Sequence, residues 1–70
     1  MDAIELKNAL SNRKPIILNI PLIGDVPYKR VSGIIYRDID GSIDISAELL
    51  STNGNSVTIA DPKRLRYAQA

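Results

Sequence analysis

Carboxylate side chains gather in the middle of this 70-residue chain, where Asp38, Asp40 and Asp44 lie close together. Clustered oxygen ligands suit a calcium ion, and a calcium loop would also use a glycine such as Gly41. An EF-hand loop needs its glycine at the sixth position and a glutamate at the twelfth, and the sequence does not have that spacing. Asp40-Gly41 is instead typical of a tight turn between two strands. We therefore expect a turn here and no metal ion.

Side chains for covalent or acid–base catalysis are scarce. The sequence contains no cysteine and no histidine, so it lacks the reactive thiol and the commonest general base and metal ligand. Asp44 and Glu48 would share one face of a strand, but two exposed carboxylates without a pocket are usually only solvated. No glycine-rich phosphate loop before a helix and no zinc spacing occurs. We expect neither enzymatic activity nor a cofactor.

Basic side chains are the better candidates for binding, and tyrosines lie close to them in sequence. The candidates are Lys29, Arg30, Lys63, Arg64, Arg66 and Tyr67. Ammonium and guanidinium groups hold phosphates, and tyrosine rings stack on bases. The alternative is an ordinary solvated surface, because nine basic side chains against eight acidic ones give a net charge of only +1. We favour that alternative, so a nucleic-acid or nucleotide partner is the second hypothesis.

The elements that must position these groups are centred on residues 31–60, which read as three antiparallel strands joined by two turns. A two-residue loop at Asp40-Gly41 pairs Arg37 with Asp44. The same register collects apolar side chains on one face and mostly polar ones on the other, as a half-buried sheet requires. Gly33 is placed for a kink or bulge early in the first strand.

The second turn contains Asn53-Gly54 and admits two registers. A two-residue loop would set Leu49 opposite Thr58 and mix apolar with polar side chains on each face. A three-residue loop over 52–54 sets Leu49 opposite Val57 and gives Gly54 the position that needs a left-handed backbone. The sequence therefore predicts the three-residue loop.

Residues 2–11 predict a helix, because Asp2 and Glu5 have the spacing of a capping box and apolar residues recur every three or four positions. Residues 16–23 are apolar almost throughout, and Pro21 places them at an edge or a strand end. An apolar edge needs a cover, so we expect the helix on one side and a second subunit on the other. The expected interface residues are Ile16, Ile17, Leu18, Ile20, Leu22 and Ile23.

The C-terminal part predicts a 3₁₀ turn at Asp61-Pro62 and a short last strand around Leu65 and Tyr67. With the helix over about 2–11 and a β-rich region over about 16–68, residues 1–70 form one domain of mainly β (α+β) class. We expect a small five-stranded antiparallel barrel, whose layout resembles that of SH3-like barrels because a 3₁₀ turn precedes the last strand. An open, curled sheet with the helix across one face is the alternative.

The stretch SAELLSTNGNSVTIADPKRLRY, residues 46–67, also resembles a group of small uncharacterised proteins from bacteria and their phages. The shared pattern is a strand ending in AELL, an Asn-Gly turn, SVTIADP and a basic residue, and it covers roughly a third of the chain. The resemblance implies a setting, that of a small accessory protein, and no activity.

Composition also bears on where the protein works. A chain without cysteine suits a reducing compartment, and no apolar run approaches the roughly 20 residues that span a bilayer. The first residues do not have the layout of a signal peptide, so we expect a cytoplasmic protein without membrane contact. Our first functional hypothesis is a non-catalytic interaction module that self-associates or binds a protein. The second is a nucleic-acid or nucleotide-like anion binder that uses the basic residues around 63–66.

Overall fold

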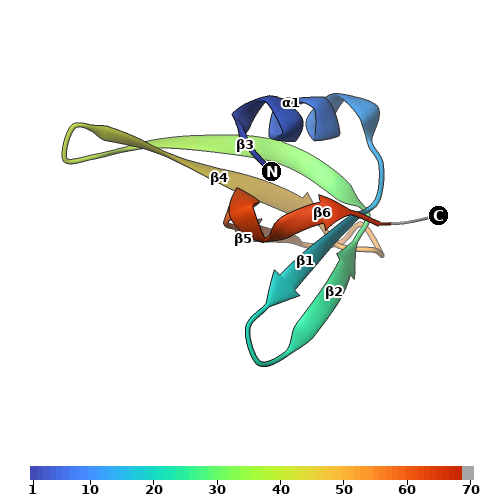
Figure 1. Cartoon of the computed structure of the whole chain (residues 1–70). Coiled ribbons are helices and arrows are strands. Elements are labelled where there is room, and N and C mark those ends of the chain that lie inside the picture. The colour runs from blue at the N-terminus through green and yellow to red at the C-terminus, as the bar shows by residue number, and fades with distance from the viewer. Residues whose placement is uncertain (69–70) are drawn as a thin grey trace.

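The computed structural model describes residues 1–68, and within them it contains one α-helix and six β-strands. In chain order the elements are α1 (Ala3–Asn12), β1 (Ile16–Ile20), β2 (Gly24–Tyr28), β3 (Arg30–Ile39), β4 (Ser42–Leu50), β5 (Val57–Ala60), the 3₁₀ helix η1 (Pro62–Arg64) and β6 (Leu65–Tyr67). The strands form two antiparallel sheets, with the orders β2-β1-β6 and β3-β4-β5 (Figure 1). The mainly β architecture with an N-terminal helix is confirmed.

The expected five-stranded barrel is wrong in two respects. Residues 1–68 contain six strands, and the two sheets do not close into a barrel. The additional strand is β2, which pairs antiparallel with β1 along its whole length, and at Lys29 the chain passes from the first sheet to the second. Closure fails because β5 ends at Ala60 and β6 pairs only with β1. The observed arrangement, two three-stranded antiparallel sheets, also differs from the single open sheet of the alternative.

The first hairpin has the predicted register, with Arg37 opposite Asp44. Its turn residues Asp40 and Gly41 have φ of +49° and +86°, the left-handed values that a two-residue hairpin turn requires. The strand pairing shifts between Val31 and Gly33, so the bulge expected early in this strand is present. The register is confirmed, but the apolar face is not buried along its whole length, because Tyr36 and Ile43 are 63% and 65% exposed.

The second hairpin has the register that we rejected, because Leu49 lies opposite Thr58. The prediction assumed that the side chains of Val57 and Ile59 belong to the core. They face outward instead and are 51% and 46% exposed, while Ala60 is buried. The outer face of this short edge strand is uncovered, so mixed polarity across the pair carries little cost.

Hydrogen bonds inside the loop explain why the other register forms. The backbone N–H of Ser51 donates to the carbonyl of Ser56 at 2.9 Å, which closes a four-residue loop over 52–55. Within it the carboxamide oxygen of Asn53 accepts from the hydroxyl of Ser51 at 2.6 Å and from the N–H of Asn55 at 3.0 Å. Gly54 keeps the left-handed backbone expected of it, with φ of +75°. The hydrogen bonds within the loop therefore decide the register of the hairpin.

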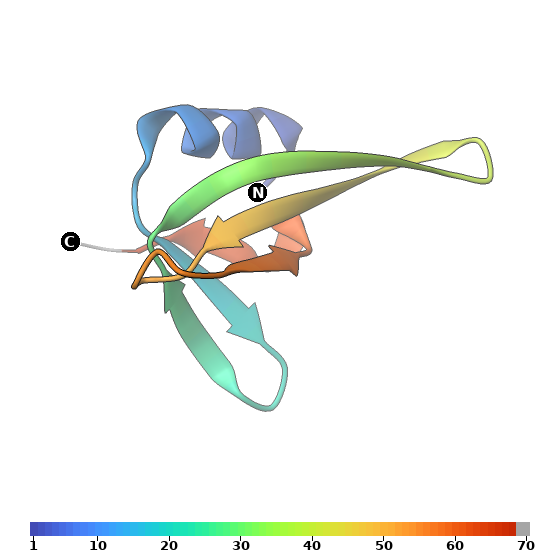
Figure 2. The ribbon, with the colours of Figure 1, turned by 180° about the vertical axis from the view of Figure 1, so that it is seen from behind.

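The core lies between α1 and the two sheets. Its buried side chains are Leu6, Ala9, Ile16, Leu18, Val31, Ala47, Leu49, Ala60 and Leu65. The helix is held at its start by the predicted capping box, in which the carboxylate of Asp2 accepts from the N–H of Glu5 at 2.8 Å. Two hairpins project from this core in different directions, β1–β2 and β3–β4 (Figures 1 and 2).

Candidate functional site

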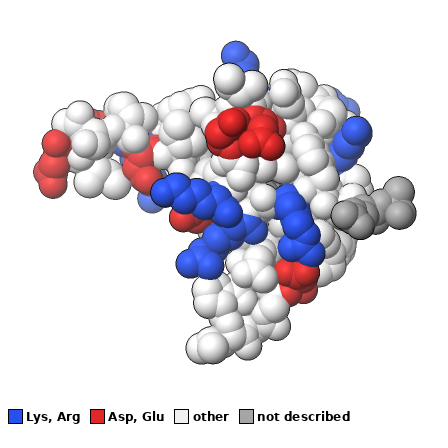
Figure 3. Space-filling model, in the orientation of Figure 1, with Lys and Arg blue, Asp and Glu red and all other residues white. Residues whose placement is uncertain are grey.

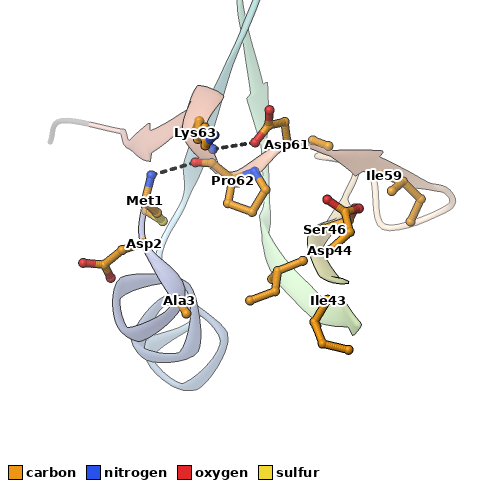
Figure 4. A pocket seen from close by; sticks show the side chains of 12 residues that line it. Met1, Asp2, Ala3, Ile43, Asp44, Ser46, Ile59, Asp61, Pro62 and Lys63 are labelled. Carbon is orange, nitrogen blue, oxygen red and sulfur yellow. Dashed lines mark hydrogen bonds between the residues drawn. The ribbon is translucent and has the colours of Figure 1, made fainter. Parts of the chain in front are cut away.

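An open groove of about 590 Å³ runs along one edge of β4, between the start of α1 and η1. In Figure 4 the start of the helix, with Met1 and Ala3, lies on one side of the groove and Ile43 and Asp44 lie on the other. The lining residues are Met1, Asp2, Ala3, Ile43, Asp44, Ile45, Ser46, Ile59, Ala60, Asp61, Pro62 and Lys63. We call this hollow the β4-edge groove.

The strand edge in this groove has no partner strand in residues 1–68. β3 pairs with β4 from Ser42 to Leu50, whereas β5 pairs with it only from Ala47 to Leu50. In an antiparallel ladder alternate residues point their N–H and C=O to opposite sides. The bond from Ser51 to Ser56 shows that the odd-numbered residues of this strand face β5. The N–H and C=O groups of Ile43 and Ile45 therefore point to the open edge.

The open edge exists because β5 stops at Asp61-Pro62. Continued pairing would bring residue 62 opposite Ile45, and proline has no N–H to donate. The side chain of Asp61 instead accepts from the N–H of Lys63 at 3.0 Å and so begins η1. The amino group of Met1 donates to the carbonyl of Pro62 at 2.6 Å, which holds this turn beside the helix. The predicted 3₁₀ turn is confirmed, and its consequence for β4 was not foreseen.

The groove is acidic on balance. Three carboxylates line it, those of Asp2, Asp44 and Asp61, against two positive groups, the ammonium group of Lys63 and the amino group of Met1. Within residues 1–68 the ion pair with N···O within 4 Å joins Arg66 and Asp25, outside the groove. The groove carboxylates therefore keep acceptor capacity for a ligand, although Asp2 and Asp61 also cap helices.

The basic candidates do not all meet. Lys63 and Arg64 are exposed neighbours on η1, and basic side chains gather over η1 and β6 in Figure 3. Lys29 lies at the other end of β5, where its Nζ approaches the loop at Gly54. Arg30 is half-buried opposite Leu50. The structure therefore separates these two pairs of cations by the length of β5.

Arg66 is engaged with Asp25, which lies two strands away on the far side of β1. The guanidinium group donates to both carboxylate oxygens of Asp25, and the side-chain amide of Asn19 donates to one of them at 3.0 Å. These hydrogen bonds lower the pKa of Asp25 to about 2, chiefly through Arg66, while the carboxylate raises the pKa of the Arg66 guanidinium. Arg66 thus ties the two outer strands of the first sheet together.

Tyr67 is also used inside the fold. Its hydroxyl accepts from the side-chain amide of Asn12 at 2.9 Å, and Nζ of Lys14 lies 5.9 Å from the ring centroid. These contacts join the end of α1 to the last strand. The ring of Tyr67 is only partly exposed, so it is less suited to stacking on a base than the prediction assumed.

The apolar segment 16–23 divides into core and surface. Ile16 and Leu18 are buried in the core, and Ile17 and Ile20 are half-buried. Leu22 is fully exposed and Ile23 is 74% exposed, at the tip of the β1–β2 hairpin. Only the far end of the predicted interface is thus displayed fully on the surface.

A second groove, of about 310 Å³, lies beside this tip between β1 and β5. We call it the β1–β5 groove. It is lined by Leu18, Asn19, Ile20, Pro21, Thr58, Ile59, Ala60, Asp61 and Arg64. The exposed tip and an apolar hollow are therefore close neighbours on one part of the surface.

The described part of the chain, residues 1–68, holds no group of three or more His, Cys, Asp or Glu side chains that could bind a metal ion. It also has no helix that is both long and apolar enough to cross a membrane.

Comparison with protein-family models, curated proteins and solved structures found no match. The resemblance of residues 46–67 to bacterial and phage proteins stays a prediction.

Proposed function

We propose that the chain is a small, non-catalytic interaction module that self-associates through the tip of the β1–β2 hairpin. The observation that carries the proposal is Leu22, a fully exposed apolar side chain on a left-handed backbone with φ of +70°. A leucine in this conformation costs about 1–2 kcal/mol, and an exposed side chain returns little of it to the fold. A contact with another molecule would offset that cost.

A second copy of the chain offers a suitable surface for the tip. Burying Leu22 and Ile23 would contribute about 1.5–3 kcal/mol each, and the apolar β1–β5 groove lies beside them. A specific interface normally buries more than about 1,000 Å² in total. The tip of one copy against the β1–β5 groove of the next, with Ile59 at its border, extends the contact beyond the two tip residues.

Sedimentation velocity over a wide concentration range tests this proposal. Leu22→Asn removes the apolar side chain and keeps a residue that tolerates a left-handed backbone, so the fold is retained. We expect the wild-type chain to associate as concentration rises and the variant to remain monomeric. Ile4→Gln is the matched control, because Ile4 is 73% exposed on α1, away from the tip. Wild-type chain that stays monomeric at millimolar concentration contradicts the proposal.

The second candidate function is binding of a nucleic-acid or nucleotide-like anion at η1. It is favoured by the exposed, adjacent side chains of Lys63 and Arg64 and by the gathering of basic groups over η1 and β6 (Figure 3). Affinity for a single-stranded oligonucleotide should fall steeply with salt and be lost in Lys63→Ala/Arg64→Ala. If Lys29→Ala lowered the affinity for the oligonucleotide by as much as the double substitution, the binding site would not be at η1. A cytoplasmic accessory role in a bacterial or phage setting is part of the same proposal.

A further inference from the structure

We propose that the β4-edge groove binds an extended, basic segment of another protein, which adds to the second sheet as an antiparallel strand beside residues 43–46. This inference does not rest on self-association at the β1–β2 tip. It rests on an unpaired strand edge, on the apolar and acidic side chains beside that edge, and on a hollow of suitable size.

The backbone of β4 supplies the main recognition groups. Ile43 and Ile45 direct their N–H and C=O groups to the open edge, because Ser51 fixes which residues face that side. An added strand would pair with these groups in line with β5. Backbone pairing of this kind provides affinity in strand-addition complexes, while side-chain contacts provide specificity. The groove volume of about 590 Å³ suits a short segment in extended conformation.

The side chains along the edge predict the sequence of the segment. Ile43 and Ile45 lie on the inner face, which the start of α1 borders through Ala3 (Figure 4). Asp44 lies on the outer face by the alternation of the strand, and Asp61 is nearby in the groove lining. Residues of an added strand alternate in the same way. The segment should therefore carry apolar residues at every second position and lysine or arginine between them.

A second copy of this chain fits the edge less well. Pairing two β4 edges through Ile43 and Ile45 of each copy would set the two Asp44 side chains directly opposite one another. Like charges opposite each other across a strand pair are destabilising. A basic segment removes this repulsion and adds attraction to the acidic lining of the groove. Charge complementarity therefore selects a different protein as the partner.

A labelled synthetic peptide of alternating lysine and valine tests the inference without altering the protein. In antiparallel pairing the valine N–H groups face β4 and the lysine N–H groups face solvent. N-methylation of the valines should weaken binding at least tenfold, measured by fluorescence polarisation, and N-methylation of the lysines should change it less than threefold. A glutamate–valine peptide should not bind. Amide NMR shifts should concentrate at Ile43 and Ile45.

Matched protein variants test the charge contribution. Asp44→Asn should weaken lysine–valine peptide binding several-fold, while Asp38→Asn, with the same change in net charge, should not. Asp38 lies on the other strand of the hairpin, and an asparagine there still offers an oxygen to the N–H of Gly41. Leu22→Asn should bind the peptide as the wild type does, which separates this test from that of self-association.

Three results would overturn the inference. They are equal binding by the two methylated peptides, no peptide binding at millimolar concentration, and concentration-dependent protection of the Ile43 and Ile45 amides without any peptide. The last of these would show that a second copy occupies the groove.

Discussion

The central strands of the two sheets differ in how much of their length is flanked on both sides. β1 is flanked by β2 along its whole length and by β6 over Ile16–Leu18. β4 is longer, and β5 accompanies only its last part, Ala47–Leu50. The first sheet therefore leaves its central strand exposed at one short end, whereas the second leaves residues 42–46 open to a partner.

This difference shows how one strand can serve two purposes. Side chains on the inner face of β4 belong to the core where both β3 and β5 flank the strand. They lie on the surface where β5 is missing. Leu49 is fully buried and Ile43 is 65% exposed, although they share the same alternation. The ending of β5 at Asp61-Pro62 sets the boundary between the two roles.

The largest expected effect is a difference in stability between substitutions at the buried end of β4 and at its open end. Leu49→Ala should lower the free energy of unfolding by about 2–5 kcal/mol, because it deletes fully buried atoms from the core. Ile43→Ala should lower it by no more than about 0.5 kcal/mol, since the side chain is mostly exposed. Urea unfolding followed by circular dichroism measures both. Similar losses would mean that the open end is covered in solution.

A smaller effect on stability should distinguish the two turns that flank β4, one containing Gly41 and the other Gly54. Gly54 and Gly41 both have left-handed backbones, with φ of +75° and +86°, and an added Cβ would meet no close neighbour at either position. Alanine at either glycine therefore adds strain of about 1 kcal/mol. Gly54→Ala should reduce the global free energy of unfolding by that amount. Its loop joins β5 to the part of β4 that is paired with strands on both sides. Gly41→Ala should mainly loosen the projecting hairpin.

Hydrogen exchange distinguishes the two outcomes. Amides of β3 and β4 near Gly41 should exchange faster in Gly41→Ala, while core amides keep their protection. In Gly54→Ala the core amides should lose protection together. Loss of core protection in both variants would show that the hairpin folds as one unit with the core.

The sequence predicts structure well where local chemistry decides it. Asp40-Gly41 specifies a hairpin turn, Asp2 and Glu5 specify a capping box, and Asp61-Pro62 specifies a 3₁₀ start, and all three are present. Each of these features is settled within a few residues. They could be predicted because no distant neighbour is needed to form them.

The remaining errors come from neighbours that lie far apart in sequence. Polarity alone did not show that Val57 and Ile59 face solvent on an edge strand. In residues 16–23, Pro21 marked a strand end, but the apolar run did not show that Ile16 is buried in the core and that Leu22 is exposed at a hairpin tip. The β4-edge groove was missed for a related reason. The signal was Pro62, which ends β5, but its meaning depends on the relative lengths of two strands.

The ion pair of Arg66 with Asp25 likewise joins residues that are far apart in sequence, so it could not be predicted. It also gives the smallest expected difference in stability between the two sheets. Its partner Asp25 belongs to the other outer strand, so the pair fastens β6 to β2 across β1. No ion pair within residues 1–68 does this for β3 and β5. The first sheet should therefore respond to acid in a way that the second does not.

The response follows from the pKa of Asp25, which is lowered from 3.8 to about 2 in the folded chain. A depressed pKa favours the folded state above the unfolded value, and this contribution is lost as pH falls from about 4 toward 2. Both side chains are exposed, so the gain is small and salt should weaken it. In Arg66→Gln the pKa of Asp25 should rise toward its ordinary value in an NMR titration, and in the control Arg64→Gln it should stay low. An unchanged titration in Arg66→Gln would mean that the amide of Asn19, rather than Arg66, sets the acidity of this carboxyl group.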